Sequence, residues 1–479
     1  MRLRGVLLLG RDTLGVNSVK RSGRAGRILV VVACLPQPAC EFCKVDYTSS
    51  EDMQLGRREF VKYLLAAGAA LTRAAPGGMP SGASLLASPR RQSGGANTGK
   101  TYDVAVIGAG VFGAWTAYHL ERSGKKVALL DAYGPANSRA SSGGESRIIR
   151  MGYGPDEIYT RWAMRSLRLW QDFFSRANRP LFHRTGVLWL AGAEDHYARG
   201  TLETLGKLSV RFERLDRPEL EKRFPQFAFG NVSWGIFEPD SGALMARRAV
   251  QAVVEEAVNN GVDYLPEFVV APGGTGHLAA IKTLSGGTVS AASYVFACGP
   301  WLGKVFPELL GERIFPTRQE VYFIGVPPGD RRFAPPAMPT WIFNADEVYG
   351  LPDLENRGLK IALDRHGPPF DPDIGRRVVT AEGVTAIRRY VAQRFPALQG
   401  APVVETRVCQ YENASNGDFL IDRHPAFENV WLVGGGSGHG FKHGPALGEY
   451  VAARVTEGGA VESRFTLATK QKLQKRAVF

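Results

Sequence analysis

Cysteine is scarce in this chain, with five residues among 479. So few thiols cannot form the disulfide framework on which small secreted proteins depend. Cys40 and Cys43 make a single Cys-x-x-Cys pair, and neither a second pair nor a set of histidines accompanies it. A structural zinc site needs four such ligands, so we predict no metal centre. Cys298 ends an apolar run, which is typical of a small buried residue.

Long hydrophobic runs are also missing. No stretch reaches the roughly 20 apolar residues that a transmembrane helix needs, so we predict no stable insertion into a membrane. The net charge is +13, but the first 100 residues hold 15 Lys or Arg and 6 Asp or Glu, which leaves only +4 for the other 379. A nucleic-acid-binding surface needs basic residues concentrated on the folded domain, and this distribution excludes one.

The chain does contain a glycine turn between a strand and a helix. The apolar run Asp103–Ile107 is typical of a buried parallel strand, and Ala114–Arg122 has the pattern of a helix. Between them, Gly108 permits a tight turn, Gly110 lets the backbone approach a pyrophosphate, and Gly113 lets the helix pack close to the strand. The N-terminus of such a helix attracts phosphate.

A second strand ends in an acid at the expected distance. Val127–Leu130 leads into Asp131, at the spacing of a carboxylate that accepts hydrogen bonds from a ribose. Strand, turn, helix and acid in this order predict a dinucleotide site, the alternative being a plain strand-helix-strand turn. The pattern alone does not distinguish NAD from FAD.

The first hundred residues carry a different signal. Arg57 and Arg58, followed by a short apolar run, resemble a bacterial twin-arginine export signal. We interpret residues 53–75 as that signal, 1–52 as a non-native or unusual extension, and 76–100 as a flexible linker rich in Gly, Ser, Ala and Pro. This predicts a periplasmic protein that engages the export machinery. A basic amphipathic helix or a transit peptide is the alternative for the signal, and the cytoplasm is the alternative location.

Beyond Lys100 the chain alternates between strand and helix patterns. Short alternating runs such as Gly186–Ala191 predict antiparallel strands. Further elements bear on the site: helices at Ile158–Ala177 and Ala243–Gly261, a buried strand at Tyr294–Phe296 beside the first strand, and a late strand at Val430–Val433 that leads into Gly434–Gly440. The chain therefore enters and leaves the dinucleotide domain several times.

Four stretches downstream of the glycine turn form a pattern of their own. They are Ser141–Arg150; Val348–Pro352 with Gly358–Lys360; Val408–Tyr411 with Phe419–Pro425; and Gly436–Lys442. In this order and spacing they resemble the amine-oxidising flavoproteins of the D-amino-acid-oxidase-like superfamily, most closely the branch of monomeric sarcosine oxidase, N-methyltryptophan oxidase and pipecolate oxidase. The resemblance covers about residues 101–466 and implies FAD as the cofactor.

The resemblance implies an α/β fold class, with a Rossmann-like FAD-binding domain and an α+β substrate domain built on an antiparallel sheet. The FAD domain would comprise residues 101–180, 241–310 and 402–466, and the substrate domain 181–240 and 311–401. The implied reaction oxidises the C–N bond of a secondary or N-methyl amino acid to an imine and reduces O2 to H2O2. The partners are then a small amino-acid substrate and O2, with the protein a monomer or homodimer.

The resemblance also assigns substrate contacts. Arg150 and Lys442 match the pair that grips the substrate carboxylate, Arg as a planar two-pronged donor and Lys as a point charge. Tyr349 matches an aromatic hydroxyl that shapes the substrate pocket. For Arg150 the alternative is an ordinary surface ion pair, and Tyr349 could equally be a core residue.

Lys360 matches the lysine on the oxygen-reacting face of the flavin. A fixed cation there stabilises the superoxide that forms when oxygen is reduced. Because Leu359 and Ile361 would face the opposite side of the strand, Lys360 points into the site if that opposite side is core. An edge lysine that guards a sheet is the alternative.

Cofactor contacts follow from the same resemblance. Ser142 lies in the segment that runs along the flavin, and Arg147 matches a positive charge beside it. Cys409 falls where the family branch attaches FAD through a thioether, so a covalent flavin is expected, the alternative being ordinary buried packing.

The late glycine-rich loop completes the expected cofactor site. Gly436, Gly438 and Gly440, with Lys442 behind them, stand at a helix start, where backbone N–H groups can stabilise an anionic reduced flavin. A simple turn before a helix is the alternative interpretation.

Departures from the family pattern concern the substrate. Sarcosine oxidase has two adjacent histidines where this chain has Ser142 and Gly143, and a histidine where this chain has Asp364. These changes predict a substrate other than sarcosine, such as a bulkier or cyclic secondary amino acid. Three alternatives stay open: a flavin dehydrogenase that passes electrons to a quinone or carrier, an NAD-dependent enzyme, and a non-catalytic FAD-binding subunit.

Overall fold

A computed structural model describes residues 3–10, 13–16, 27–33, 44–48 and 97–475. The chain divides into two compact units, Met1–Arg91 and Gln92–Phe479. The predicted export signal at 53–75, and most of the predicted linker at 76–100, lie outside the described residues.

The first unit contains a small sheet that the sequence analysis does not predict. Its order is β2-β1-β3-β4, in which β1 and β3 are parallel and the other two pairs are antiparallel. The strands are β1 (Leu3–Gly10), β2 (Thr13–Val16), β3 (Arg27–Ala33) and β4 (Lys44–Thr48).

The second unit contains a seven-stranded sheet of order β13-β6-β5-β15-β22-β21, with β14 paired to β15. Its first five strands in that order are parallel. The predicted neighbour of the first strand is confirmed, because Val295 of β15 pairs with Val106 of β5. The strands are β5 (Asn97–Ile107), β6 (Val127–Leu130), β13 (Asp263–Leu265), β14 (Ala280–Lys282), β15 (Thr288–Phe296), β21 (Leu420–Arg423) and β22 (Val430–Gly434).

Apolar side chains cover both faces of this sheet, as its parallel strands require. Val104 and Val106 pack with the long helices, while Ala105 and Ile107 pack on the other face with the short ones. The long helices are α2 (Val111–Arg122), α3 (Glu157–Arg176), α6 (Ala246–Asn259) and α10 (Gly444–Glu457), and the short ones are α7 (Leu302–Val305) and α8 (Pro307–Leu310). None of the helices in the described part of the chain has both the length and the apolar character needed to cross a bilayer.

A second, eight-stranded sheet has the order β10-β11-β9-β17-β18-β19-β16-β20. Every neighbouring pair is antiparallel except β9 and β17, which are parallel. The strands are β9 (Val187–Ala191), β10 (Glu213–Asp216), β11 (Trp234–Glu238), β16 (Ile314–Ile324), β17 (Thr340–Phe343), β18 (Val348–Leu351), β19 (Leu359–Leu363) and β20 (Val403–Ala414). A dinucleotide-type parallel sheet beside this second sheet confirms the predicted fold class.

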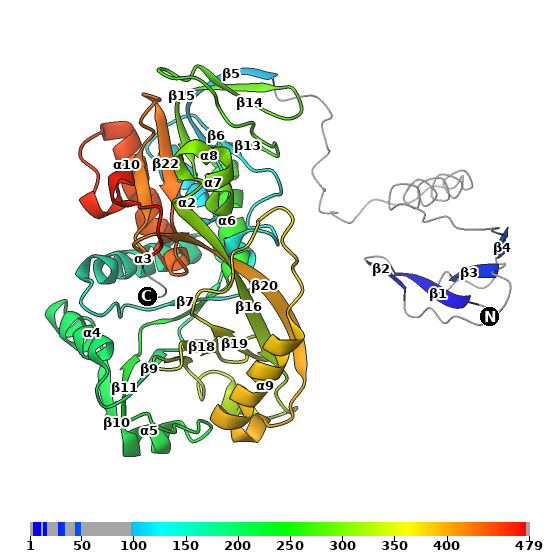
Figure 1. The fold of residues 1–479 in the computed structure, drawn as a ribbon, viewed down its shortest axis with the longest axis vertical. Coiled ribbons are helices and arrows are strands. Elements are labelled where there is room, and N and C mark those ends of the chain that lie inside the picture. The colour runs from blue at the N-terminus through cyan, green and yellow to red at the C-terminus, as the bar shows by residue number, and fades with distance from the viewer. Residues whose placement is uncertain (1–2, 11–12, 17–26, 34–43, 49–96, 476–479) are drawn as a thin grey trace. The chain divides into compact units, whose positions relative to one another are not determined.

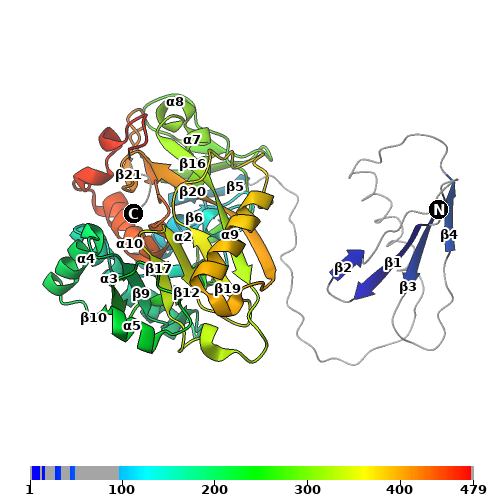
Figure 2. The same cartoon turned by 60° about the horizontal axis from the view of Figure 1, so that its bottom comes forward.

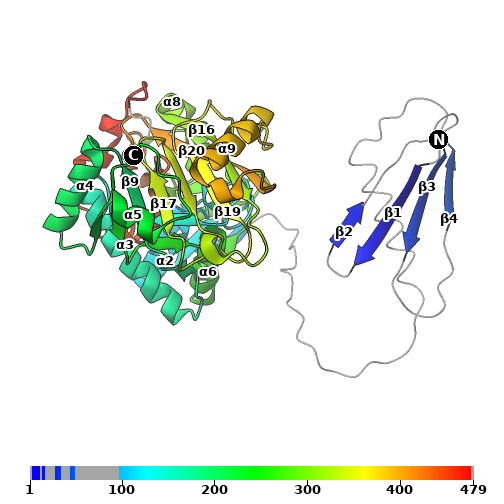
Figure 3. The same ribbon diagram turned by 90° about the horizontal axis from the view of Figure 1, so that it is seen from below.

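One face of the eight-stranded sheet is covered by helices, and the other faces the site. Leu359 and Ile361 pack against Ile387 and Val391 of α9 (Ala381–Arg394), which lies along the sheet in Figures 2 and 3. The remaining helices of this region are α4 (His196–Lys207) and α5 (Arg217–Arg223). Cys409 belongs to a separate small apolar cluster on the opposite face.

Short elements connect the two sheets. A three-stranded sheet joins β7 (Arg147–Ile149), β12 (Gly242–Leu244) and β8 (Phe182–His183). The predicted helix at Ala243–Gly261 therefore begins only at Ala246, because its first residues pair as β12. The 3-10 turns are η2 (Ser141–Gly143), η3 (Gly299–Trp301), η4 (Arg331–Phe333), η5 (Pro396–Leu398), η6 (Gly440–His443), η7 (Ser463–Phe465) and η8 (Leu467–Thr469).

The predicted division into FAD and substrate segments stays a prediction. The long strands β16 and β20 pair from Ile314↔Ala414 to Ile324↔Val403, so residues 403–414 belong to the eight-stranded sheet. The sequence analysis places these residues with the FAD domain. Their far end nevertheless reaches β22, because a Cβ on Gly434 would stand 2.3 Å from Glu412 Oε1.

Replacing Gly113 by alanine is expected to lower the free energy of unfolding by about 1–3 kcal/mol, because overpacked positions relax poorly. A Cβ there would stand 1.8 Å from the Gly108 carbonyl oxygen, which is backbone. The matched control is Gly206→Ala in α4, where a Cβ meets no heavy atom within 4 Å. That change should raise stability by about 0.5–1 kcal/mol, because alanine favours a helix over glycine. Equal denaturation midpoints for the two variants would contradict this packing.

Candidate active site

Two adjoining cavities lie where the sheets meet. The first, here called the cofactor trough, extends from Gly110 past Ser142 and Gly299 to Cys409 and Gly436. The second, here called the inner pocket, is lined by residues of the eight-stranded sheet, of β7 and of the segment that follows β22. The two cavities share Arg147, Tyr411, Gly438 and Phe441, so one space leads into the other.

The glycine turn forms one end of the trough. Gly108 has a φ of +106°, and a Cβ there would stand 2.4 Å from the Ala297 carbonyl oxygen, so the protein itself requires glycine. At Gly110, the N-cap residue of α2, the nearest protein atom to a Cβ would be Ser142 Oγ at 3.6 Å. A side chain at position 110 would therefore clash with no protein atom. The space beside Gly110 suits a ligand at the helix N-terminus.

Asp131 lies beside this turn. Its carboxylate accepts hydrogen bonds from the backbone N–H groups of Ala109 (2.8 Å), Tyr133 (2.9 Å) and Gly134 (2.9 Å). Burial raises the pKa of Asp131, although these three donors act in the opposite direction. Ser142, from η2, accepts a bond from Val111 N at 3.0 Å and so closes the same end of the trough.

The glycine-rich loop after β22 forms the other wall. A Cβ on Gly436 would meet only the Phe112 ring at 3.8 Å and Gly440 Cα at 3.9 Å, so this wall is open as well. The loop N–H groups are largely committed within the protein: those of His439 and Gly440 donate to the Gly436 carbonyl at 3.0 and 2.8 Å. They are therefore less available to a flavin than the sequence suggests.

Arg147 and Cys409 line the far side of the trough, and Lys360 is buried close to both of them. Arg147 Nη2 donates to the Ser141 carbonyl at 2.7 Å and to Cys409 Sγ at 3.2 Å. The Cys409 thiol is free, and only 8% of the residue is exposed. Lys360 is buried, and its Nζ donates to the Ser146 carbonyl at 2.6 Å. Burial and the neighbouring Arg147 hold the pKa of Lys360 well below its ordinary value. Among the described residues that line the two cavities, Lys360 does not appear.

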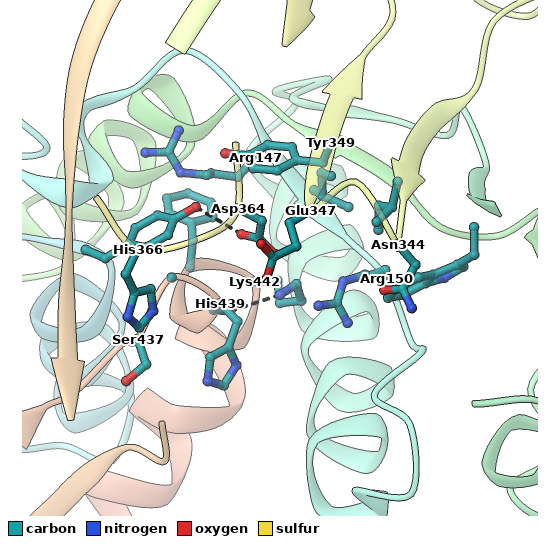
Figure 4. A pocket seen from close by; sticks show the side chains of 16 residues that line it. Arg147, Arg150, Asn344, Glu347, Tyr349, Asp364, His366, Ser437, His439 and Lys442 are labelled. Atoms are coloured by element: carbon teal, nitrogen blue, oxygen red, sulfur yellow. Dashed lines mark hydrogen bonds between the residues drawn. The ribbon is translucent and has the colours of Figure 1, made fainter. Parts of the chain in front are cut away.

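Arg150 and Lys442 project into the inner pocket (Figure 4). The Arg150 guanidinium lies over the rings of Tyr153 and Trp189, at 4.4 and 4.6 Å from their centroids. Lys442 Nζ donates to Tyr153 Oη at 2.7 Å and to the His439 carbonyl at 2.9 Å. Burial, and then Arg150, lower the pKa of Lys442 well below its ordinary value. Two buried cations side by side favour an anionic ligand.

Sequence reasoning missed the residues that hold these cations in place. Tyr153 Oη also meets His443 Nε2 at 2.7 Å, and both side chains are fully buried. Glu238 accepts bonds from Met151 N, Gly152 N, Trp189 Nε1 and Ser241 Oγ at 2.6 to 3.0 Å, which fixes the loop after Arg150. The only signal in the sequence was the proximity of His443 to Lys442.

Acidic and phenolic groups line the opposite side of the inner pocket. Tyr411 Oη donates to Asp364 Oδ1 at 3.2 Å, and Tyr411 also hydrogen-bonds Tyr349. Burial raises the pKa of Asp364, while Arg150 and Lys442 act in the opposite direction. Glu347 lies beside Asp364, and Figure 4 shows both carboxyls directed at the space that Arg150 and Lys442 face.

The fold and the two cavities define a dinucleotide-binding protein whose trough opens into a cation-lined pocket. Residues 103–454 match the model of the FAD dependent oxidoreductase family. The chain belongs to this family, which confirms the resemblance and FAD as the cofactor. The trough fits that cofactor, because Gly110 and Gly436 leave its walls open and its far end reaches Cys409.

Curated relatives and solved structures agree with this assignment. Monomeric sarcosine oxidase of Bacillus sp. (strain NS-129) is 31% identical over 391 residues, which cover 79% of this chain and 99% of that protein. N-methyl-L-tryptophan oxidase of Salmonella heidelberg (strain SL476) is 30% identical over 358 residues, which cover 73% and 94%. The crystal structure of L-proline dehydrogenase from P. horikoshii shares the fold, with a TM-score of 0.65 at 20% identity and coverage of 75% and 95%.

Small carboxylates are expected to bind in the inner pocket more tightly at low pH. The ligand-free pKa of Lys442 is lowered by burial and by Arg150, against the weaker opposing effect of Asp364 and Glu238. An entering anion raises that pKa, so affinity is full below the ligand-free pKa and is lost as the pH rises through it, by about tenfold per pH unit.

Acetate titrations at several pH values, followed by the flavin absorbance, measure this dependence. Lys442→Met should remove the pH dependence, whereas Arg150→Gln should weaken binding at every pH and leave the slope intact. A Lys442→Met variant that keeps the original pH profile would contradict the assignment.

Proposed function

We propose that this enzyme oxidises the C–N bond of a secondary or N-methyl amino acid to the imine, and that O2 is reduced to H2O2. The observation that carries the proposal is the pair Arg150 and Lys442, buried in a pocket that opens onto the FAD trough. The similarity to sarcosine oxidase and N-methyl-L-tryptophan oxidase supports it.

Arg150 and Lys442 hold the substrate carboxylate in this proposal. FAD supplies the two-electron acceptor when bound. Oxidation removes two electrons and two protons from the C–N unit, and the imine is then hydrolysed in water. Arg147 places a fixed positive charge at the junction of the two cavities, where charge builds up during the reaction.

Asp364 and Glu347 face the substrate from the other side of the inner pocket. A carboxylate in place of a histidine favours an amine that carries protons to donate, and Tyr349 and Tyr411 shape the space beside it. This arrangement supports a secondary amino acid as the substrate, and we propose one other than sarcosine because Asp364 stands where sarcosine oxidase has a histidine.

Anaerobic mixing with sarcosine, N-methyltryptophan, proline, pipecolate and D-amino acids tests this function. A secondary or N-methyl amino acid should bleach the flavin, and admitting air should restore its colour with one peroxide per turnover. Bleaching only by D-amino acids would overturn the secondary-amine proposal. Bleaching without peroxide would favour a dehydrogenase, and no bleaching by any compound would favour a non-catalytic subunit.

We also propose that Lys360 promotes the reaction with oxygen. Lys360→Met should slow reoxidation of the reduced flavin by about 10²–10³-fold, the effect typical of losing one electrostatic contact in a buried site. Anaerobic reduction should change little. Stopped-flow absorbance measures both half-reactions, and Lys282→Met on β14, an exposed position, is the matched control. An unchanged reoxidation rate in Lys360→Met would contradict the role.

A covalent bond between FAD and Cys409 is part of the proposal. After acid precipitation the yellow colour should stay with the protein, and in Cys409→Ser it should pass to the supernatant. The control is Cys298→Ser, because Cys298 is the other free cysteine among the described residues and should leave the attachment intact. Colour in the supernatant of the unaltered protein would show a non-covalent cofactor.

Export through the twin-arginine route is a further proposal. It rests on Arg57, Arg58 and the apolar run that follows them. A flavoprotein suits this route, because a chain that binds its cofactor in the cytoplasm is folded before export.

A further inference from the structure

A buried carboxyl group that none of the roles above uses lines the cofactor trough. Glu412, on β20, is 6% exposed and shares the trough wall with Gly110, Gly299 and Gly436. Its carboxyl accepts hydrogen bonds from the backbone N–H groups of Gly435 and Gly436. Its Oε1 atom is buried and has no hydrogen-bond partner in the described part of the chain. A buried oxygen without a partner costs about 1–3 kcal/mol, and this incompletely satisfied carboxyl group belongs to a residue of the trough wall.

The surroundings of Glu412 contain no partner of opposite charge. In the described residues no salt bridge involves it, and the loop after β22 offers only backbone N–H groups. From the end of β15, the Cys298 thiol is the titratable group that interacts electrostatically with Glu412. Its own strand contributes Cys409 and Tyr411, and Arg147 lies farther along the trough. Burial accordingly raises the pKa of Glu412 to about 7.

The location identifies the part of the cofactor that Glu412 faces. A Cβ on Gly434, the last residue of β22, would stand 2.3 Å from Glu412 Oε1, so the carboxyl lies at the C-terminal ends of the parallel strands. Ligands of such sheets bind at these ends. The turn at Gly110 suits the pyrophosphate and Cys409 marks the flavin end, so the chain that joins them passes through the same trough.

We infer that Glu412 is a further FAD ligand, whose carboxyl group in its neutral form donates a hydrogen bond to an oxygen of the ribityl-pyrophosphate chain. A carboxylate at this position would repel the pyrophosphate. The neutral acid instead gives its own buried carboxyl group and the cofactor oxygen a hydrogen-bond partner. FAD binding above the cofactor-free pKa of Glu412 therefore takes up one proton. Affinity is full below that pKa and is lost as the pH rises through it.

The test uses the full chain with Cys409→Ser, so that FAD is removable, and measures FAD affinity by fluorescence quenching from about pH 6 to about pH 9. With Glu412 present, affinity should fall by about tenfold per pH unit above the pKa. Glu412→Gln keeps a donor of the same shape, so its affinity should be independent of pH. Glu412→Ala should bind more weakly at every pH. Calorimetry in two buffers should show uptake of one proton per FAD at high pH, and none for Glu412→Gln.

An unaltered pH profile in Glu412→Gln, or no proton uptake with Glu412 present, would overturn the inference. Circular dichroism shows whether each variant folds. If the FAD-free protein fails to fold, the holoenzyme decides: its infrared spectrum minus that of Glu412→Gln should contain a protonated-carboxyl band at high pH, and a carboxylate band there would refute the role. The inference depends on FAD binding and not on the substrate, so flavin that no amine bleaches would leave it intact.

Discussion

Three buried cationic side chains and the half-buried Arg147 constrain this site more than any other feature. Arg150, Lys360 and Lys442 are 6% exposed or less, and Arg147 separates the trough from the inner pocket. Burial of like charges is unfavourable unless each finds compensation. Aromatic faces and backbone carbonyls supply part of it, but Asp364 is the principal carboxylate that opposes Arg150 in the inner pocket. In the proposed function, the remaining compensation comes from an anionic reduced flavin and a substrate carboxylate.

The two sheets carry different parts of the site. The parallel sheet carries the glycine turn and Asp131, which stay the predicted contacts of the nucleotide end of FAD, and the eight-stranded sheet carries Cys409 on the face opposite α9. The strand β20 connects the two sheets. Its residue Cys409 lines the trough, and its residue Glu412 lies against Gly434 at the end of β22. A shift of this strand by one residue would therefore turn the thiol into the core and move the carboxyl out of the trough.

Local sequence patterns predicted the features that depend on neighbouring residues. The roles of Gly108 and Gly113 follow from one turn, and the structure shows both positions closed to a side chain. Strand alternation also predicted that Lys360 and its neighbours lie on opposite faces of β19, since Leu359 and Ile361 pack against α9, and the role of Lys360 beside the flavin stays a prediction. Family resemblance supplied FAD, which the fingerprint alone left open.

The sequence did not predict the site residues that only tertiary packing brings together. Tyr153, Glu238 and His443 come from three distant segments, and each has an ordinary local setting until the fold joins them around Lys442. The availability of the loop N–H groups after β22 was overestimated for the same reason, because their acceptors are contributed partly by β20. Neither the hydrophobic periodicity of a segment nor a local motif predicts such contacts.

In the proposed function, the buried cations are matched to a substrate carboxylate beside FAD. The most direct measurement compares kcat/KM for an N-methyl amino acid with that for its amide, which has the same shape and no negative charge. We expect kcat/KM for the amide to be lower by at least about a hundredfold, because a buried charge then loses its partner. Equal values for the two compounds would contradict it.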